Sequence, residues 1–196
     1  MPRKYELRQR AERQAQTRRR IVEATVELHN TVGPARTTIG AIAELAGVER
    51  LTVYRHFPDQ ADLSRACVAH FLAVNPPPAA GEWLAIADPA QRLRAGLAAS
   101  YAYYRGNEPG MAVILRDREA GLPVGAGFVA YQETARDAIA AAWPAQPQVA
   151  AVIGHALDFQ AWRSLAVRQG LDDSAIVELM VELVEAATRR SRAHPT

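Results

Sequence analysis

Apolar residues recur every three to four positions along most of the chain, which is the period of an amphipathic helix. In residues 17–30, TRRRIVEATVELHN, one stripe includes Ile21 and Leu28, and the stop signal Gly33-Pro34 follows. The pattern therefore predicts a first helix over residues 17–30.

Two shorter helical patterns follow directly. Either Thr37 or Thr38 can cap the second helix, and Gly47 permits the left-handed turn that ends it. A third helix is predicted over about residues 49–57, where Pro58 closes it. A helix this short is not stable alone, because nucleation costs more than its few hydrogen bonds return. We therefore expect the third helix to be held by packing against the first two.

A fourth helix, over residues 59–74, is predicted to connect this head to the rest of the chain. The proline-rich stretch NPPPAAG, residues 75–81, marks the expected boundary between two domains, 14–74 and 75–196. Beyond it no segment alternates as a strand does, and the expected helices are roughly 89–105, 108–119, 124–142, 148–169 and 172–192. The predicted fold class is therefore all-α, with a three-helix head followed by a helical domain.

Charge is distributed unevenly along the chain. The 196 residues are 49% hydrophobic, which is enough for a buried core, and the formal net charge is only +2. Residues 1–58 carry 11 Lys or Arg against 6 Asp or Glu, net +5, and the remainder carries 12 against 15, net −3. A basic head attracts polyanions, although a solvated basic helix face explains the charge equally well. Arg8, Arg10 and Arg13, with Arg3 and Lys4, are possible members of a DNA-binding arm or simply solvated.

Cysteine usage and the N-terminal residues indicate a cytoplasmic protein. Cys67 is the single cysteine, so neither an internal disulfide nor a cysteine zinc site is expected. The first residues, MPRKYELRQR, lack the apolar stretch of a signal peptide, and prolines interrupt the long uncharged runs. We expect no membrane partner, no metal and no cofactor.

Catalysis has little support in the sequence. No metal-ligand cluster or phosphate-binding glycine loop is present in the pattern, and Cys67 lies in a stretch typical of core. The carboxylate pairs Asp117 and Glu119, and Asp172 and Asp173, are interpreted as solvent-facing or capping groups rather than as an acid–base pair. The chain is therefore not expected to be an enzyme.

The second helix, the glycine turn and the short third helix together predict a helix-turn-helix, whose last helix enters a DNA major groove. Its outer face would offer hydrogen-bond donors, an apolar group for thymine methyls and phosphate ligands. The candidate residues are Arg50, Leu51, Thr52, Tyr54, Arg55 and His56, with Thr38 as both helix cap and phosphate ligand. Three alternatives remain open: Arg50 is merely solvated, Leu51 is exposed without function, or Tyr54 packs in the core.

At these residues the sequence resembles a known family. The segment TTIGAIAELAGVERLTVYRHFPDQADL is similar to the N-terminal domain of the tetracycline-repressor (TetR) family, and the likeness extends back through TRRRIVEATVEL to cover about residues 14–72. The resemblance implies an all-helical homodimer whose head binds a double-stranded DNA operator and whose C-terminal domain binds a small-molecule effector. It also implies phosphate contacts by Tyr54 and His56.

Two positions depart from the family pattern. His29 and Asn30 stand where the family usually has a phenylalanine, so a buried His29 would need a hydrogen-bond partner. Gln60 replaces a lysine that often meets a phosphate, which puts that one contact in doubt.

The C-terminal domain holds the aromatic and soft side chains expected of an effector pocket, although core packing alone would require many of them. The candidate ligand-binding residues are Tyr101, Tyr104, Met111, Phe128, Tyr131, Phe159 and Trp162.

Residues 148–169 and 172–192 each carry more apolar surface than one packing partner can cover. Pairing both segments with those of a second copy would bury the surplus in a four-helix dimer interface. The candidate interface residues are Val152, His155, Ile176, Leu179, Met180, Leu183, Val184 and Ala187.

The sequence thus predicts a ligand-responsive, homodimeric transcriptional regulator, a repressor that binds a palindromic operator, with residues 59–74 as the lever between its domains. The alternative is an all-helical small-molecule-binding or interaction protein without DNA binding, and a helical enzyme is a third, less supported hypothesis.

Overall fold

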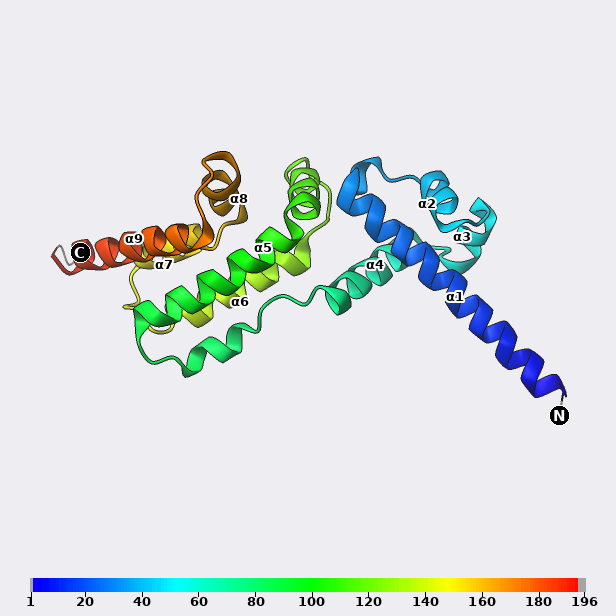
Figure 1. Cartoon of the computed structure of the whole chain (residues 1–196), viewed down its shortest axis with the longest axis horizontal. Helices are drawn as coiled ribbons and strands as arrows, with labels where there is room; N and C mark the ends of the chain where they lie inside the picture. Colours follow the sequence, from blue (N-terminus) through cyan, green and yellow to red (C-terminus); the bar gives the residue numbers. More distant parts are fainter. Residues whose placement is uncertain (1, 194–196) are drawn as a thin grey trace. The chain divides into compact units, whose positions relative to one another are not determined.

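The computed structural model describes residues 2–193, with side chains from Tyr5 to Ser191 (Figure 1). Every regular element in that range is helical, which confirms the all-α fold class. The described chain divides into two compact units. The first comprises residues up to Pro76 together with Pro109–Val124, and the second comprises Pro77–Glu108 together with residues from Gly125 onward.

The head of the first unit consists of four α-helices and a short 3-10 turn. Their bounds are α1 Pro2–Thr31, η1 Pro34–Arg36, α2 Ile39–Ala46, α3 Arg50–His56 and α4 Gln60–Val74. Only α1 differs much from its prediction, because it begins fifteen residues before residue 17. The early part is polar, so it carries no apolar stripe, but it is rich in Arg, Gln, Glu and Ala, which favour helix intrinsically.

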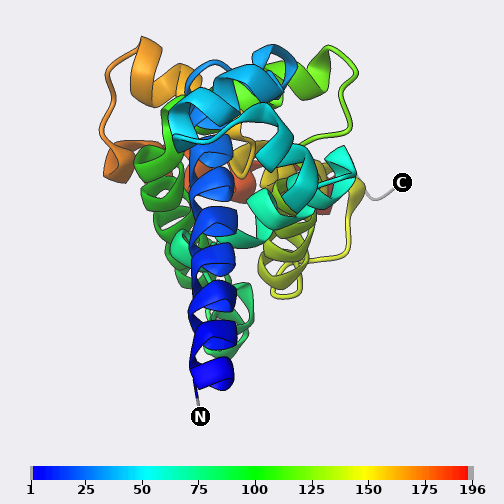
Figure 2. The same ribbon diagram turned by 90° about the vertical axis from the view of Figure 1, so that its right-hand side faces the viewer.

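The core of the head lies where α1, α2, α3 and α4 meet. It is formed by Ile21, Val22, Ala24, Ile42, Ala43, Ala46, Val53, Phe57 and Leu63. The first α1 residue that belongs to this core is Ile21. In Figure 1 and in the turned view of Figure 2, the N-terminal end of α1 projects beyond α2 and α3. Val53 of α3 and Phe57, just beyond it, belong to the core of the head. The third helix is therefore held by tertiary packing, as expected of so short a segment.

The C-terminal end of α5 (Pro89–Glu119) packs against the α1–η1 connection in the first unit. Asp117, interpreted from the sequence as a solvent-facing or capping group, is only 3% exposed, so it does not face solvent. Its carboxylate accepts a hydrogen bond from the Ala35 amide at 2.8 Å and a second from Arg116 at 2.7 Å. Gly33 makes this approach possible, because its φ is 95° and a Cβ there would lie 2.6 Å from Asp117 Oδ2.

The Asp117 carboxylate is held in its charged form. Burial raises the pKa of this carboxyl, but the hydrogen bonds from Ala35 and Arg116 and the charges of Arg116 and His29 outweigh burial and bring the pKa below its ordinary value. His29 is half-buried nearby and does find a partner, since its Nδ1 lies 3.5 Å from Cys67 Sγ. Burial lowers the pKa of His29, opposed by the charge of Asp117.

The second unit contains the N-terminal part of α5 and the later helices. Their bounds are η2 Ala80–Ala85, α6 Ala126–Ala140, α7 Pro147–Ala156, α8 Phe159–Arg163, the π-helical turn η3 Ser164–Arg168 and α9 Asp173–Ala193. The predicted break between residues 105 and 108 is wrong, because α5 continues through Pro109. The single helix predicted over 148–169 is also wrong: the Asp158 carboxylate accepts from the Ala161 amide at 2.8 Å and so starts α8 as a separate helix.

An aromatic cluster forms the centre of the second unit. The Tyr104 ring lies 5.7 Å, centroid to centroid, from each of Phe128, Phe159 and Trp162. The Tyr104 hydroxyl donates to the Leu157 carbonyl at 2.7 Å, and burial raises the pKa of that phenol. All three tryptophans of the chain, Trp83, Trp143 and Trp162, belong to this unit.

Two further predictions concern single elements. Asp172 accepts from the Ala175 amide at the start of α9, so the predicted capping role is confirmed, whereas Asp173 pairs with Arg105.

Among the described residues, no helix combines the length and the apolar character needed to cross a bilayer.

Candidate nucleic-acid interface

The turn between α2 and α3 follows directly from the local sequence. Thr38 caps α2, because its hydroxyl oxygen accepts from the Ala41 amide at 3.1 Å. Gly47 ends α2 in the left-handed region, with φ 63° and ψ 44°, where a side chain would be strained. The Val48 amide then donates to the Ala43 carbonyl at 2.9 Å, which locks the turn. The predicted helix-turn-helix is therefore present.

One face of α3 is buried and the opposite face is exposed to solvent. Val53 is fully buried and Phe57, just beyond the helix, is 3% exposed, so this side anchors α3 to the core. On the other side Leu51 is 75% exposed and Tyr54 52% exposed. The alternative in which Tyr54 packs in the core is thus contradicted. The outward face of α3 is free to meet a large partner.

The two arginines of α3 lie at different ends of the helix. The Arg50 guanidinium packs on Gly40 in the first turn of α2, where a Cβ would approach its Nη2 to 2.6 Å. Exposed Thr38 caps the same helix start, and backbone amides at a helix start favour anions. Arg55 is exposed, and its Nη2 donates to Thr52 Oγ1 at 3.4 Å.

Arg18 joins α1 to the end of α3. Its Nη1 donates to the His56 carbonyl at 3.1 Å, and its guanidinium carbon lies 4.0 Å from the centroid of the Phe57 ring. Burial lowers the pKa of the His56 side chain, and the neighbouring charges of Arg55 and Arg18 lower it further. The imidazole is therefore biased toward its neutral form in the free protein.

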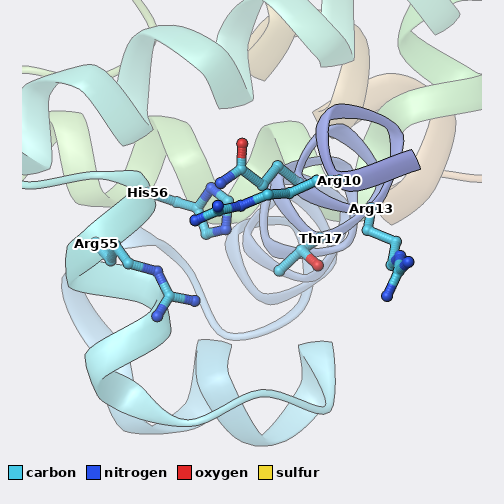
Figure 3. Close-up of a pocket in the computed structure, with 6 residues that line it drawn as sticks. Arg10, Arg13, Thr17, Arg55 and His56 are labelled. Carbon is cyan, nitrogen blue, oxygen red and sulfur yellow. The ribbon is translucent and has the colours of Figure 1, made fainter. Parts of the chain in front are cut away.

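A groove of about 570 Å³ lies between α1 and the end of α3 (Figure 3). We call it the basic groove, and its lining residues are Arg10, Arg13, Gln14, Thr17, Arg55 and His56. Figure 3 shows Arg10 reaching from α1 toward His56 of α3. The sequence predicts Arg10 and Arg13 as members of an arm or as solvated side chains, and it does not single out Gln14, Thr17 and Arg18. The spacing 10, 13, 14, 17 marks one helix face and was the available signal. The side chains of Arg3 and Lys4 lie outside the described residues.

This geometry agrees with comparisons to known proteins. Residues 21–67 match the family model described as "Bacterial regulatory proteins, tetR family". The chain is 43% identical over 60 residues to two proteins of Pseudomonas putida, the HTH-type transcriptional regulator TtgR and the probable HTH-type transcriptional regulator ArpR. The N-terminal domain of the chain belongs to the TetR family. The alignments cover 31% of this chain and 29% of either relative, so they concern this TetR-family domain alone.

Most of the chain also resembles a solved structure in its fold. A crystal structure of a TetR transcription regulator from Haloarcula marismortui ATCC 43049 superposes with a TM-score of 0.54 over 90% of this chain and 98% of that chain. The two sequences are 16% identical, so the likeness concerns the fold alone.

The residues predicted to bind an effector divide between the two units. Six of them belong to the second unit: Tyr101, Tyr104, Phe128, Tyr131, Phe159 and Trp162. They pack ring against ring, and all but half-buried Phe128 are 8% exposed or less. Met111 is buried on the part of α5 that belongs to the first unit.

The residues predicted for a dimer interface differ in exposure. Ile176, Met180 and Val184 are buried within the second unit, so α9 uses this stripe for its own packing against neighbours such as α7. Leu179 and Leu183 remain 44% and 43% exposed on the same helix. The other three predicted residues are exposed His155 and half-buried Val152 and Ala187.

Proposed function

We propose that this chain is a DNA-binding transcriptional regulator, acting as a repressor that binds a palindromic operator as a homodimer and responds to a small-molecule effector. One observation carries the DNA-binding part: α3 is anchored by Val53 and Phe57, while its outward face presents Arg50, Leu51 and Tyr54 to solvent. A rigidly held helix with donors on its free face suits major-groove reading.

Selection of bound fragments from random duplex DNA tests this proposal. Wild-type protein should enrich an inverted repeat, because two heads related by a two-fold axis meet two half-sites. On the selected duplex, Arg50→Ala should weaken binding by about 1–3 kcal/mol and relax preference at one base pair. Tyr54→Phe should weaken binding similarly on selected and random duplexes, since a phosphate contact carries no sequence information. Retention of wild-type affinity by both variants would contradict the proposal.

The homodimer is supported by the exposed apolar stripe of α9. Leu179 and Leu183 are separated by four positions and so share one helix face, which would be covered by the same face of a second copy. Leu183→Glu should yield a monomer in light scattering, because an unpaired charge is costly in a buried interface. Leu171→Glu is the matched control: Leu171 is also partly exposed, at 38%, but precedes α9. Equal masses for wild type and Leu183→Glu would count against this interface.

Effector control is supported by the composition of α5. Residues Pro89–Glu108 of this helix carry Tyr101 and Tyr104 of the aromatic cluster, and Pro109–Glu119 carries Asp117, which holds the α1–η1 connection. Pro109 stands at the division and removes one backbone hydrogen bond, so it offers a hinge. We infer that α5, together with the lever already expected in α4, transmits effector binding to the head.

A compound screen checks the effector proposal. An apolar or aromatic compound that binds the cluster should change operator affinity by about 5- to 150-fold, and the operator should change compound affinity by the same factor. Phe128→Leu alters a cluster residue that is only half-buried and should change compound affinity without unfolding the protein. A confirmed cluster binder that leaves operator affinity unchanged would refute control through this site.

A further inference from the structure

The N-terminal part of α1 is helical although it contributes no residue to the core of the head. Residues 5–20 are exposed or half-exposed, and the core begins at Ile21. Side-chain pairs four positions apart support the helix, namely Arg8 with Glu12 at 3.0 Å and Gln9 with Tyr5 at 2.9 Å. Such pairs explain why the segment is helical. They do not explain why one face of it is aligned with the end of α3.

That aligned face is the α1 side of the basic groove. Arg10, Arg13 and Thr17 stand within two turns of one another on the helix and line the groove together with Arg55 and His56 of α3. Figure 3 shows Arg10 extended toward His56, whereas the end of the Arg13 side chain points away from α3. No carboxylate lines the groove, and no ion pair among the described side chains engages Arg10, Arg13 or Arg55. Cations gathered without counter-charge repel one another, so an anion entering the groove is stabilised by all of them.

The alignment of the two helices is itself fixed. Arg18 lies one helical position beyond Thr17, bonds to the His56 carbonyl and stacks on Phe57, whose side chain is buried in the head. Arg18 is therefore a positioning residue, which ties α1 to the last turn of α3. The groove is a built surface of the first unit rather than a chance meeting of flexible side chains.

We propose that the basic groove is a second DNA-contact surface, which seats backbone phosphates of the duplex beside the segment read by α3. This inference rests on the proposed function, because it places the same duplex on a further part of the head. The position of the groove next to α3 indicates which partner fills it. Arg55 and His56 line the groove and are also the last two residues of α3, so a duplex held by α3 brings its phosphates to the groove.

The chemistry of the groove suits phosphates better than bases. Arginine, threonine and glutamine side chains donate to phosphate oxygens, and the groove offers no apolar wedge for a base step. The contact adds affinity without sequence preference. It also gives the N-terminal part of α1 a role that the helix-turn-helix alone does not require.

Paired double variants isolate this surface. Arg10→Gln/Arg13→Gln removes two charges from the groove, and Arg8→Gln/Arg19→Gln removes two charges from the other side of the same helix. All four side chains are exposed, and the Arg8–Glu12 ion pair that the second variant removes is a surface pair that contributes little to stability. Both variants should therefore retain the wild-type circular dichroism spectrum and melting temperature. Affinities are measured for the full chain against a random-sequence duplex and a duplex recovered by selection, over a series of salt concentrations.

The groove variant should lose the same factor on both duplexes, and its salt dependence should be shallower by about 0.9 in log–log slope for each phosphate that it no longer neutralises. The outside variant should change both quantities much less. Neutral methylphosphonates placed singly along the selected duplex should weaken wild-type binding at specific flanking phosphates. At those positions the groove variant should be insensitive.

The outcomes separate this inference from the proposed function. If wild type binds duplex DNA but the two double variants bind equally well, or lose affinity equally, the groove is not a contact surface while the regulator remains. If wild type binds no duplex of either kind, both proposals fail. Methylphosphonate sensitivity that is identical in wild type and groove variant would also overturn the groove contact.

Discussion

The outward face of α3 and the aromatic cluster of the second unit use large side chains in opposite ways. On α3, Leu51 and Tyr54 are more than half exposed and make no contribution to the core. In the cluster, Tyr104, Phe159 and Trp162 are at most 1% exposed and touch one another. The first set lies outside the core of the head, whereas the second set lies within the core of its unit. Exposure therefore separates side chains that are available to a partner from those that stabilise their own unit.

The same contrast bears on effector binding. Cluster residues satisfy their own polar groups, as when Tyr101 donates to the Ala156 carbonyl at 2.7 Å. An effector entering here would have to displace packed rings, so the proposed pocket and the core are made of the same residues. Variants of the cluster test whether its residues serve as core, as effector pocket or as both. Variants of the head test whether the head depends on the cluster.

The largest effect is expected from Phe159→Ala. Phe159 is 1% exposed within the cluster, so truncation should lower the free energy of unfolding by about 3–5 kcal/mol. Urea unfolding followed by circular dichroism measures the loss, and Val167→Ala, at a 51% exposed position, should change stability by less than about 0.5 kcal/mol. A loss below about 1 kcal/mol for Phe159→Ala would break the comparison, because the cluster would then tolerate a cavity as a preformed pocket does.

Asp117→Ala should have the next largest effect. It leaves the Ala35 amide and Arg116 without their buried acceptor, so we expect a loss of about 1.5–3 kcal/mol at neutral pH. The folded-state pKa of Asp117 lies below its ordinary value, so its contribution is present above the unfolded pKa and is lost as pH falls through the folded pKa. Urea unfolding at neutral and acidic pH should therefore bring wild type and Asp117→Ala closer together in acid. Equal losses at both pH values would contradict the charge-assisted role.

A smaller effect concerns DNA affinity and pH. The pKa of His56 is lowered in the free protein, and Arg10, Arg13, Arg18 and Arg55 are the cations around it. A phosphate beside the imidazole would raise that pKa, so binding takes up a proton and affinity should rise severalfold as pH falls from neutral toward acid. Fluorescence anisotropy with labelled duplex measures this rise. His56→Gln should bind with little pH dependence, and an unchanged pH profile in that variant would exclude His56 as its source.

The smallest effect is expected for the pH dependence of stability, through His29 inside the head. Burial lowers the folded-state pKa of His29, so the unfolded chain binds more protons and stability should decrease as pH falls through the ordinary histidine pKa of about 6.5. His29→Phe should remove this component of the decrease in urea unfolding, while the pH profile of DNA affinity set by His56 stays in place. A His29→Phe protein whose acid sensitivity equals that of wild type would show that other groups dominate.

The recognition elements of the head were readable from the sequence because short-range signals dictate them. Thr38, Gly47 and Pro58 each act on a neighbouring backbone, and the apolar spacing fixed which side of α3 faces inward. The family and the all-α fold class were predicted on these residues and are confirmed. The roles assigned to individual DNA, effector and dimer residues stay predictions.

Features that depend on distant partners were not readable in the same way. The α5 helix continues through Pro109 because both of its ends are packed, and tertiary packing overrides a local break signal. Burial of Asp117 depends on Ala35, which lies 82 positions earlier. The N-terminal part of α1 was not predicted for another reason. Its residues favour helix intrinsically but form no apolar stripe, so hydrophobic periodicity alone does not indicate a helix there.

The placement of the three tryptophans has an optical consequence. Indole emission responds to the polarity and packing of its surroundings, and the first unit contains no tryptophan at all. An effector that loosens the rings around Trp162 should therefore change the intrinsic fluorescence of the chain, whereas a duplex held by α3 has no indole within its own unit to perturb. Any change in emission on adding duplex alone would be a direct optical readout that one unit senses what the other has bound.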